Sequence, residues 1–189
     1  MSHQRKDLTE HPISSELVYD GKLLHVRRDT VRLPDGGVAE REYIRHPGAV
    51  MIIALVDSGE LVMERQFRYP LRRDMIELPA GKIDPGEPPL ETAKRELLEE
   101  TGYSASEWRH LATIHLAIGY SDEHIEIFLA RGLTQEQAKL DDEEFLEVFT
   151  LPLAAALDWV RDGRITDSKT LSGLFWAEKV LRGPWRQNR

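Results

Sequence analysis

The segment GKIDPGEPPLETAKRELLEETGY, residues 81–103, decides how this chain folds. Pro88 and Pro89 restrict the backbone where a helix can begin, and Gly102 stands where that helix can end. We therefore predict a helix over residues 89–101. Four residues of this helix fall at helical spacing on one stripe that should pack on a core, namely Leu90, Ala93, Leu97 and Thr101.

A second face of the same helix carries crowded carboxylates. Glu96, Glu99 and Glu100 project from neighbouring positions, and each like-charge pair costs roughly 0.2–0.5 kcal/mol on an exposed helix. A divalent cation would offset this repulsion, and oxygen-only ligands favour Mg²⁺ first and Mn²⁺ second. The competing interpretation is an ordinary solvated acidic face. Arg95 can reach Glu91 or Glu99, so we expect it to orient a carboxylate rather than bind substrate.

The spacing of residues along the whole segment is a more specific signal of function than the predicted helix alone. Its fixed positions are Gly81, Glu87, Arg95, Glu96, Leu97, Glu99, Glu100, Gly102 and Tyr103. This arrangement resembles a complete Nudix box, because every fixed position of that motif is filled. The resemblance implies a Nudix hydrolase, an enzyme that splits a diphosphate linked to another group with the help of Mg²⁺ or Mn²⁺.

The composition of the 189 residues bounds the setting in which the protein works. A hydrophobic content of 41% allows a real core, and the absence of cysteine excludes disulfides and fits a cytoplasmic location. No apolar run reaches the roughly 18 residues that span a bilayer, so no membrane association is expected. The formal net charge of −8 disfavours nucleic acid as a partner. A phosphate-bearing small molecule would then need bound cations and a few local arginines.

Residues 1–45 are expected to form N-terminal strands ahead of a hydrolase domain at residues 46–189. The first 14 residues lack periodicity and are expected to be loosely attached. The predicted strands that follow lie at 17–19, 23–33 and 38–44. A sheet this small is only marginally stable in water. It should therefore pack on the main domain or on a second subunit.

Beyond residue 45, strands surround one central helix. The apolar run at 49–56 predicts a strand that is buried on both faces. Further strands are predicted at 60–67, 107–117, 124–130 and 145–150, and helices at 152–160 and 168–181. The last helix would be capped by Ser168. This mixture predicts an α+β fold. The family resemblance covers residues 45–182 and implies the Nudix α/β/α sandwich, with a small N-terminal antiparallel β-sheet in front.

Short motifs outside the box resemble the ADP-ribose pyrophosphatase group of this family. They are Arg65-Gln66-Phe67-Arg68 with Glu77-Leu78-Pro79-Ala80-Gly81, then Gly119-Tyr120-Ser121-Asp122-Glu123, and an acidic loop before Phe145. The resemblance implies hydrolysis of ADP-ribose to AMP and ribose 5-phosphate, or of a related nucleoside diphosphate sugar. It also implies a homodimer, because members of that group typically reach across to the other subunit with N-terminal strands.

The same resemblance assigns roles to single residues. The implied metal ligands are Glu96, Glu99, Glu100 and the main-chain oxygen of Ala80. The implied substrate-binding residues are Arg68, Arg65, Glu77 and Gly119, and guanidinium groups match phosphate geometry. The competing interpretation of Glu77 is an ion pair at the strand end with Arg72 or Arg73.

The remaining catalytic roles fall on three residues. Glu144 is the expected general base, with Glu143 as the alternative in the same acidic loop. Glu99 and Arg95 complete the expected catalytic set.

The substrate is the least constrained part of the prediction. Many ADP-ribose pyrophosphatases carry proline where this chain has Ile118, just before Gly119. GDP-mannose or another nucleoside diphosphate sugar is therefore an open alternative. A Nudix module that senses a nucleotide without cleaving it is a further alternative, although the complete box favours an enzyme.

Overall fold

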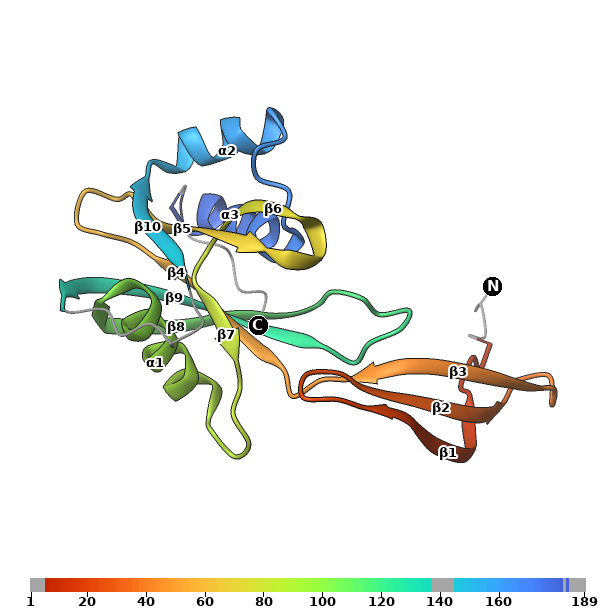
Figure 1. The fold of residues 1–189 in the computed structure, drawn as a ribbon. Coiled ribbons are helices and arrows are strands. Elements are labelled where there is room, and N and C mark those ends of the chain that lie inside the picture. Colours follow the sequence, from red (N-terminus) through yellow and green to blue (C-terminus); the bar gives the residue numbers. More distant parts are fainter. Residues whose placement is uncertain (1–5, 137–144, 182, 184–189) are drawn as a thin grey trace, which may run out of the picture. The chain divides into compact units, whose positions relative to one another are not determined.

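The computed structural model describes residues 6–136, 145–181 and 183 of the chain. Its fold divides into two compact units (Figure 1). One unit consists of Met1–His46 and His115–Glu123, and the other of Pro47–Ile114 and His124–Arg189. The short segment His115–Glu123 thus groups with the N-terminal residues, which the sequence did not suggest. The division at residue 45 into N-terminal strands and a hydrolase domain stays a prediction.

The N-terminal unit is built on a three-stranded antiparallel sheet. Its strands are β1 (His11–Asp20), β2 (His25–Arg32) and β3 (Val38–Arg45), with β2 in the centre. The expectation that residues 1–14 lie loosely outside the sheet is wrong for 11–14, because β1 begins at His11. All ten residues of β1 are exposed, and a strand with no buried face shows no alternation in its sequence.

The loop before β9 joins this unit through its main chain. The Ile44 N–H donates to the Tyr120 carbonyl at 2.9 Å, and the Asp122 N–H donates to the Ile44 carbonyl at 3.2 Å. The sheet itself buries little: among the residues of its three strands, only Val31 is buried.

The second unit centres on a four-stranded sheet in the order β7-β4-β9-β8. Its strands are β4 (Ala49–Ala54), β7 (Ala80–Lys82), β8 (Tyr103–His115) and β9 (His124–Gln135). Every residue of β4 is buried, as the apolar run predicts. This strand pairs in parallel with β9 and antiparallel with the short β7, which fixes β7 beside the centre of the sheet.

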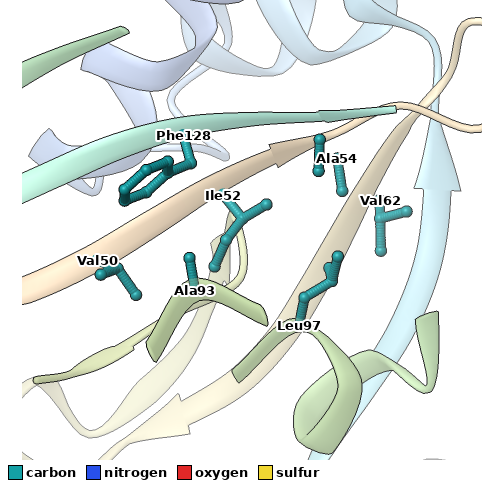
Figure 2. Packing of buried hydrophobic residues seen from close by; sticks show 8 residues of the cluster. Val50, Ile52, Ala54, Val62, Ala93, Leu97 and Phe128 are labelled. Carbon is teal, nitrogen blue, oxygen red and sulfur yellow. The ribbon is translucent and has the colours of Figure 1, made fainter. Parts of the chain in front are cut away.

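The helix predicted from the box is confirmed as α1 (Pro89–Thr101), and Gly102 ends it in the left-handed conformation with φ 71°. Ala93 and Leu97 of α1 pack on one face of the sheet, as Figure 2 shows. The sheet side of this cluster is apolar and consists of Val50, Ile52, Ala54, Phe128 and Ala130, with Val62 beside it. The packing holds α1 directly over β4 and β7.

A second, three-stranded sheet has the order β10-β5-β6. Its strands are β5 (Leu61–Arg68), β6 (Arg73–Glu77) and β10 (Leu146–Leu151), and a 3₁₀ turn, η1 (Tyr69–Leu71), joins β5 to β6. The helices that follow are α2 (Leu153–Arg161) and α3 (Ser168–Leu181). No helix of the described residues is long and apolar enough to cross a membrane.

Helix α3 covers the face of the central sheet opposite α1 (Figure 1). Gly173 permits this approach, because a Cβ there would lie 2.4 Å from Leu78 Cδ1 and 2.8 Å from Met51 Cε. The predicted α/β/α sandwich is therefore confirmed for this unit, and so is the small N-terminal antiparallel sheet.

Candidate active site

Two carboxylates of α1 converge on the main chain of β7. A Cβ added to Gly81 would lie 1.9 Å from Glu96 Cδ, so the Glu96 carboxylate lies directly against this glycine. The Ala80 N–H donates to Glu100 Oε2 at 3.1 Å. Glu96 and Glu100 are one helical turn apart, which places both on the same side of α1. The box therefore brings two acidic side chains onto the Ala80-Gly81 backbone.

Arg95 organises the acidic face from within. Its Nη1 donates to Glu96 Oε1 and to Glu99 Oε2, both at 2.9 Å, and its Nη2 donates to Glu87 Oε2 at 3.0 Å. The pKa of Arg95 lies well above its ordinary value. The hydrogen bonds to Glu87 raise it most, and Glu99 and Glu96 raise it further, whereas burial lowers it. The predicted contact with Glu99 is present, whereas Glu91 pairs with Lys94 instead.

Arg68 and Glu77 form a bidentate pair between β5 and β6. Arg68 Nε donates to Glu77 Oε1 at 2.7 Å, and Nη2 donates to Oε2 at 2.8 Å. The pKa of Arg68 is raised, first by these hydrogen bonds and further by the charges of Glu100 and Asp167. Glu100 is thus within electrostatic reach of Arg68, which links this arginine to the acidic face of α1.

The alternative prediction, an ion pair of Glu77 with Arg72 or Arg73, is wrong, because the Glu77 carboxylate bonds Arg68 and Lys169 instead. Arg73 Nη2 instead donates to the Thr166 hydroxyl at 3.0 Å. The second cation on Glu77 is Lys169, from the first turn of α3. Sequence reasoning missed Lys169, because 92 residues separate it from Glu77.

The cap of α3 is also not the one predicted. Asp167, rather than Ser168, accepts the Thr170 N–H at 2.9 Å, which is the hydrogen bond of a helix N-cap. Asp167 Oδ2 also accepts the Thr170 hydroxyl at 2.7 Å and Lys169 Nζ at 2.9 Å. The sequence offered this cap as well as Ser168, since aspartate is among the preferred N-cap residues and Asp167 directly precedes the helix.

Arg65 has a different environment from Arg68. Its guanidinium donates to Asp74 Oδ2 at 2.8 Å and also to Glu147 Oε2. Both carboxylates raise the pKa of Arg65, and Glu147 has the larger effect. Arg65 and Arg68 are three residues apart on one strand, so their side chains point to opposite faces. The structure does not bring them together, and phosphate binding by Arg65 stays a prediction.

Two expected site residues are not described as part of this unit. Gly119 belongs to the N-terminal unit, and no heavy atom lies within 4 Å of a Cβ built on it. Its role with substrate stays a prediction. Glu144, the expected general base, lies outside the described residues, as does its alternative Glu143.

The family model of the NUDIX domain matches residues 45–171, which is more than half of the chain. The chain belongs to the Nudix family. A second family model, described as a nucleoside diphosphate sugar hydrolase N-terminal domain, matches residues 10–44. The expected α+β Nudix fold and the expected hydrolase are both confirmed by these matches.

Named relatives of this Nudix hydrolase cover most of its length. It is 41% identical over 167 residues to an ADP-ribose pyrophosphatase of Bacillus subtilis, a match that covers 87% of this chain and 90% of the relative. It is 40% identical over 164 residues to a methanol dehydrogenase activator of Bacillus methanolicus, a match that covers 86% of this chain and 89% of that relative. A crystal structure of an ADP compounds hydrolase superposes with a TM-score of 0.85 at 28% identity, covering 95% of this chain and 98% of that one.

Nudix hydrolases use a divalent metal, and the donor chemistry of the box fits one. The groups near β7 are carboxylates and a main-chain carbonyl, the oxygen donors that hard cations prefer. Glu96 can lie against β7 only because residue 81 has no Cβ. Among the described residues, no group of three or more acidic, histidine or cysteine side chains is placed to hold a metal ion. The fit of the box to a metal therefore rests on the chemistry of its oxygen donors, which suit a hard cation such as Mg²⁺.

The ionisation of Glu77 gives this Nudix hydrolase a testable pH dependence. Burial alone would raise the pKa of Glu77, but Arg68 and Lys169 outweigh it and hold the pKa below its ordinary value. The ionised group therefore stabilises the fold above the pKa of the unfolded chain, and this contribution is lost as pH falls through the folded-state pKa.

We expect Glu77→Gln to lower the free energy of unfolding most near neutral pH. The difference from wild type should shrink once the pH falls below about 4, near the pKa of an ordinary glutamate. Urea unfolding of both proteins from pH 7 to pH 3 measures this difference. Glu91→Gln, an exposed change on α1, is the control and should leave stability nearly unaltered at every pH. A Glu77→Gln difference that is constant over the whole range would contradict the expectation.

Proposed function

We propose that this Nudix hydrolase cleaves the diphosphate of ADP-ribose with water, giving AMP and ribose 5-phosphate, and that Mg²⁺ or Mn²⁺ is its metal. The observation that carries the proposal is the convergence of Glu96 and Glu100 on β7, within electrostatic reach of Arg68. The names of the Bacillus subtilis relative and of the superposed hydrolase support an ADP-containing substrate. The N-terminal family match supports a nucleoside diphosphate sugar.

Each residue of the site has a distinct role in this proposal. Glu96, Glu99, Glu100 and the Ala80 carbonyl would hold the cation. When bound, the cation neutralises diphosphate charge and lowers the pKa of a water molecule. Arg68 binds oxygens of the diphosphate, and its side chain is 44% exposed although Glu77 holds one edge of its fork.

Two further groups complete the site. Arg95 orients Glu96 and Glu99 through its hydrogen bonds. Glu144 takes a proton from the attacking water as general base. The net charge of the chain also fits this division, since cation and arginine offset the negative charge that would otherwise repel the substrate.

The proposal is tested with a panel of substrates. The protein is incubated with Mg²⁺ or Mn²⁺ and with ADP-ribose, ADP-glucose, GDP-mannose, NADH or a dinucleoside polyphosphate, and the released phosphomonoesters are quantified. We expect the highest kcat/KM for ADP-ribose, with AMP as a product and no turnover in excess chelator. A clear preference for GDP-mannose would overturn the substrate assignment. No turnover of any compound would favour a nucleotide-sensing module.

The proposal includes a homodimer formed through the N-terminal strands. The β1-β2-β3 sheet leaves large apolar side chains exposed, at Ile13, Leu17, Val18, Tyr19 and Val38. A second subunit that covers them would supply the burial that a three-stranded sheet needs. A cytoplasmic location is part of the proposal, which the lack of cysteine fits.

Sedimentation tests the dimer. Full-length protein should sediment as a dimer, and a variant that lacks residues 1–45 should sediment as a monomer. A monomeric full-length protein at micromolar concentration would refute the shared sheet.

A further inference from the structure

We propose that Lys169 is a positioning residue for Arg68: by holding the buried carboxylate of Glu77, it fixes the direction in which the Arg68 guanidinium meets the diphosphate. This inference rests on the proposed function, in which Arg68 binds diphosphate oxygens. Lys169 belongs to α3, far along the chain from the box, and neither the motif nor the family comparisons assign it a role.

Glu77 carries a buried carboxylate. Its side chain is only 5% exposed, and both of its oxygens accept hydrogen bonds from Arg68. Lys169 Nζ donates to one of those oxygens, Oε2. A buried carboxylate needs its partners, because an ion removed from water is stabilised only by charges and donors in good geometry. Glu77 therefore has a defined orientation because two cations hold its oxygens, Arg68 through both and Lys169 through Oε2.

The orientation of the Arg68 guanidinium depends on that of Glu77. The guanidinium is planar, and Nε and Nη2 are both bonded to Glu77, so the plane of the carboxylate fixes the plane of the fork. The rest of the guanidinium is available for an anion, since the side chain is 44% exposed. Any rotation of Glu77 therefore turns the donors of Arg68 away from the diphosphate.

Lys169 is held in place by the N-cap of α3. Its ammonium group donates to Asp167 Oδ2 at 2.9 Å, and that oxygen is itself fixed as the cap of α3 by the Thr170 N–H. The Lys169 side chain is 12% exposed, so its position is restricted by packing. The first turn of α3 thus presents the ammonium group to Glu77 in one place.

Helix α3 contacts two consecutive residues, the last residue of β6 and the one that follows it. Lys169 bonds Glu77, and the buried Thr170 hydroxyl accepts the Leu78 N–H at 3.1 Å. The next residue, Pro79, is fixed to the central sheet through a hydrogen bond from the Ile52 N–H at 2.8 Å. The chain then enters β7 at Ala80. Of these two contacts from α3, the one made by Lys169 is charged and the one made by the Thr170 hydroxyl is neutral.

A double-mutant cycle separates positioning from mere stabilisation. The variants are Lys169→Met, Arg68→Ala and the double variant, assayed for kcat and KM with ADP-ribose. Lys169→Met alone should lower kcat/KM roughly tenfold, mainly through KM. In the Arg68→Ala background the same change should alter kcat/KM less than about twofold, because the group that it positions is gone.

Two single variants complete the kinetic test. Lys169→Arg keeps the charge and should recover most of the lost kcat/KM. Lys179→Met is the matched control, since it makes the same change on the last turn of α3 and should behave as wild type. Equal losses in both backgrounds would overturn the proposal, and so would a Lys169→Met enzyme with wild-type kinetics and only a lower thermal midpoint.

A spectroscopic readout does not depend on the substrate. The Arg68 Nε–H is hydrogen-bonded to Glu77, so its NMR signal should exchange slowly with water in wild type and several-fold faster in Lys169→Met. An unchanged exchange rate would overturn the positioning role. If wild type fails to cleave ADP-ribose, the proposed function fails on its own assay, and the exchange rate still decides whether Lys169 fixes Arg68.

Discussion

Glu100→Gln is expected to lower kcat for diphosphate hydrolysis about a thousandfold if Glu100 is the metal ligand that we propose, because losing an anionic ligand would remove about 4 kcal/mol of transition-state stabilisation. The side chain of Glu100 is buried and accepts the Ala80 N–H at 3.1 Å. A glutamine oxygen can still accept that hydrogen bond. The change therefore removes charge and coordinating power while it keeps the contact that attaches α1 to β7.

The measurement is the initial rate at saturating substrate over a wide range of Mg²⁺ concentration, together with thermal unfolding. We expect the rate to stay low even at high metal concentration, with a thermal midpoint close to wild type. Glu91→Gln is the matched control, because it makes the same change on the same helix at an exposed residue paired with Lys94. A Glu100→Gln enzyme within tenfold of the wild-type rate would mean that Glu100 is not a metal ligand.

The parts of the fold that were predicted correctly are those with local signals. Helix α1 was predicted with its ends, because prolines and a glycine mark them within the segment itself. Strand β4 was predicted because burial on both faces leaves a continuous apolar run. Strand β1 was placed only in part, because no face of it is buried and nothing in its sequence alternates.

The parts of the site that were missed depend on contacts between distant residues. Glu77 could be recognised as important from its motif, but its second cation, Lys169, comes from the start of α3. Arg65 and Arg68 look equivalent in the sequence, yet the pleat of β5 points them to opposite faces, and Asp74 and Glu147 bind only the first. Such pairings arise from strand register and helix packing, which local patterns do not encode.

Gly81→Ala should lower kcat/KM about a hundredfold with little effect on stability. The new Cβ would lie 1.9 Å from Glu96 Cδ, so the carboxylate has to move by more than an ångström. A misplacement of about 1 Å in a positioned group can cost roughly 100-fold in rate. The fold should tolerate the change, because Gly81 is not among the glycines with positive φ and the atoms in the way belong to a flexible side chain.

The distinguishing measurement is the Mg²⁺ concentration that gives half of the maximal rate. If Glu96 binds the cation from its place against Gly81, the variant should need more metal, because its ligand is displaced while Glu100 keeps its bond to the Ala80 N–H. Arg95 already bonds Glu96 and Glu99 through one nitrogen, so a displaced Glu96 also changes the contact that orients Glu99. Wild-type metal dependence together with a wild-type rate would show that the Glu96 carboxylate works from another position, and the close approach to β7 would then have no role in catalysis.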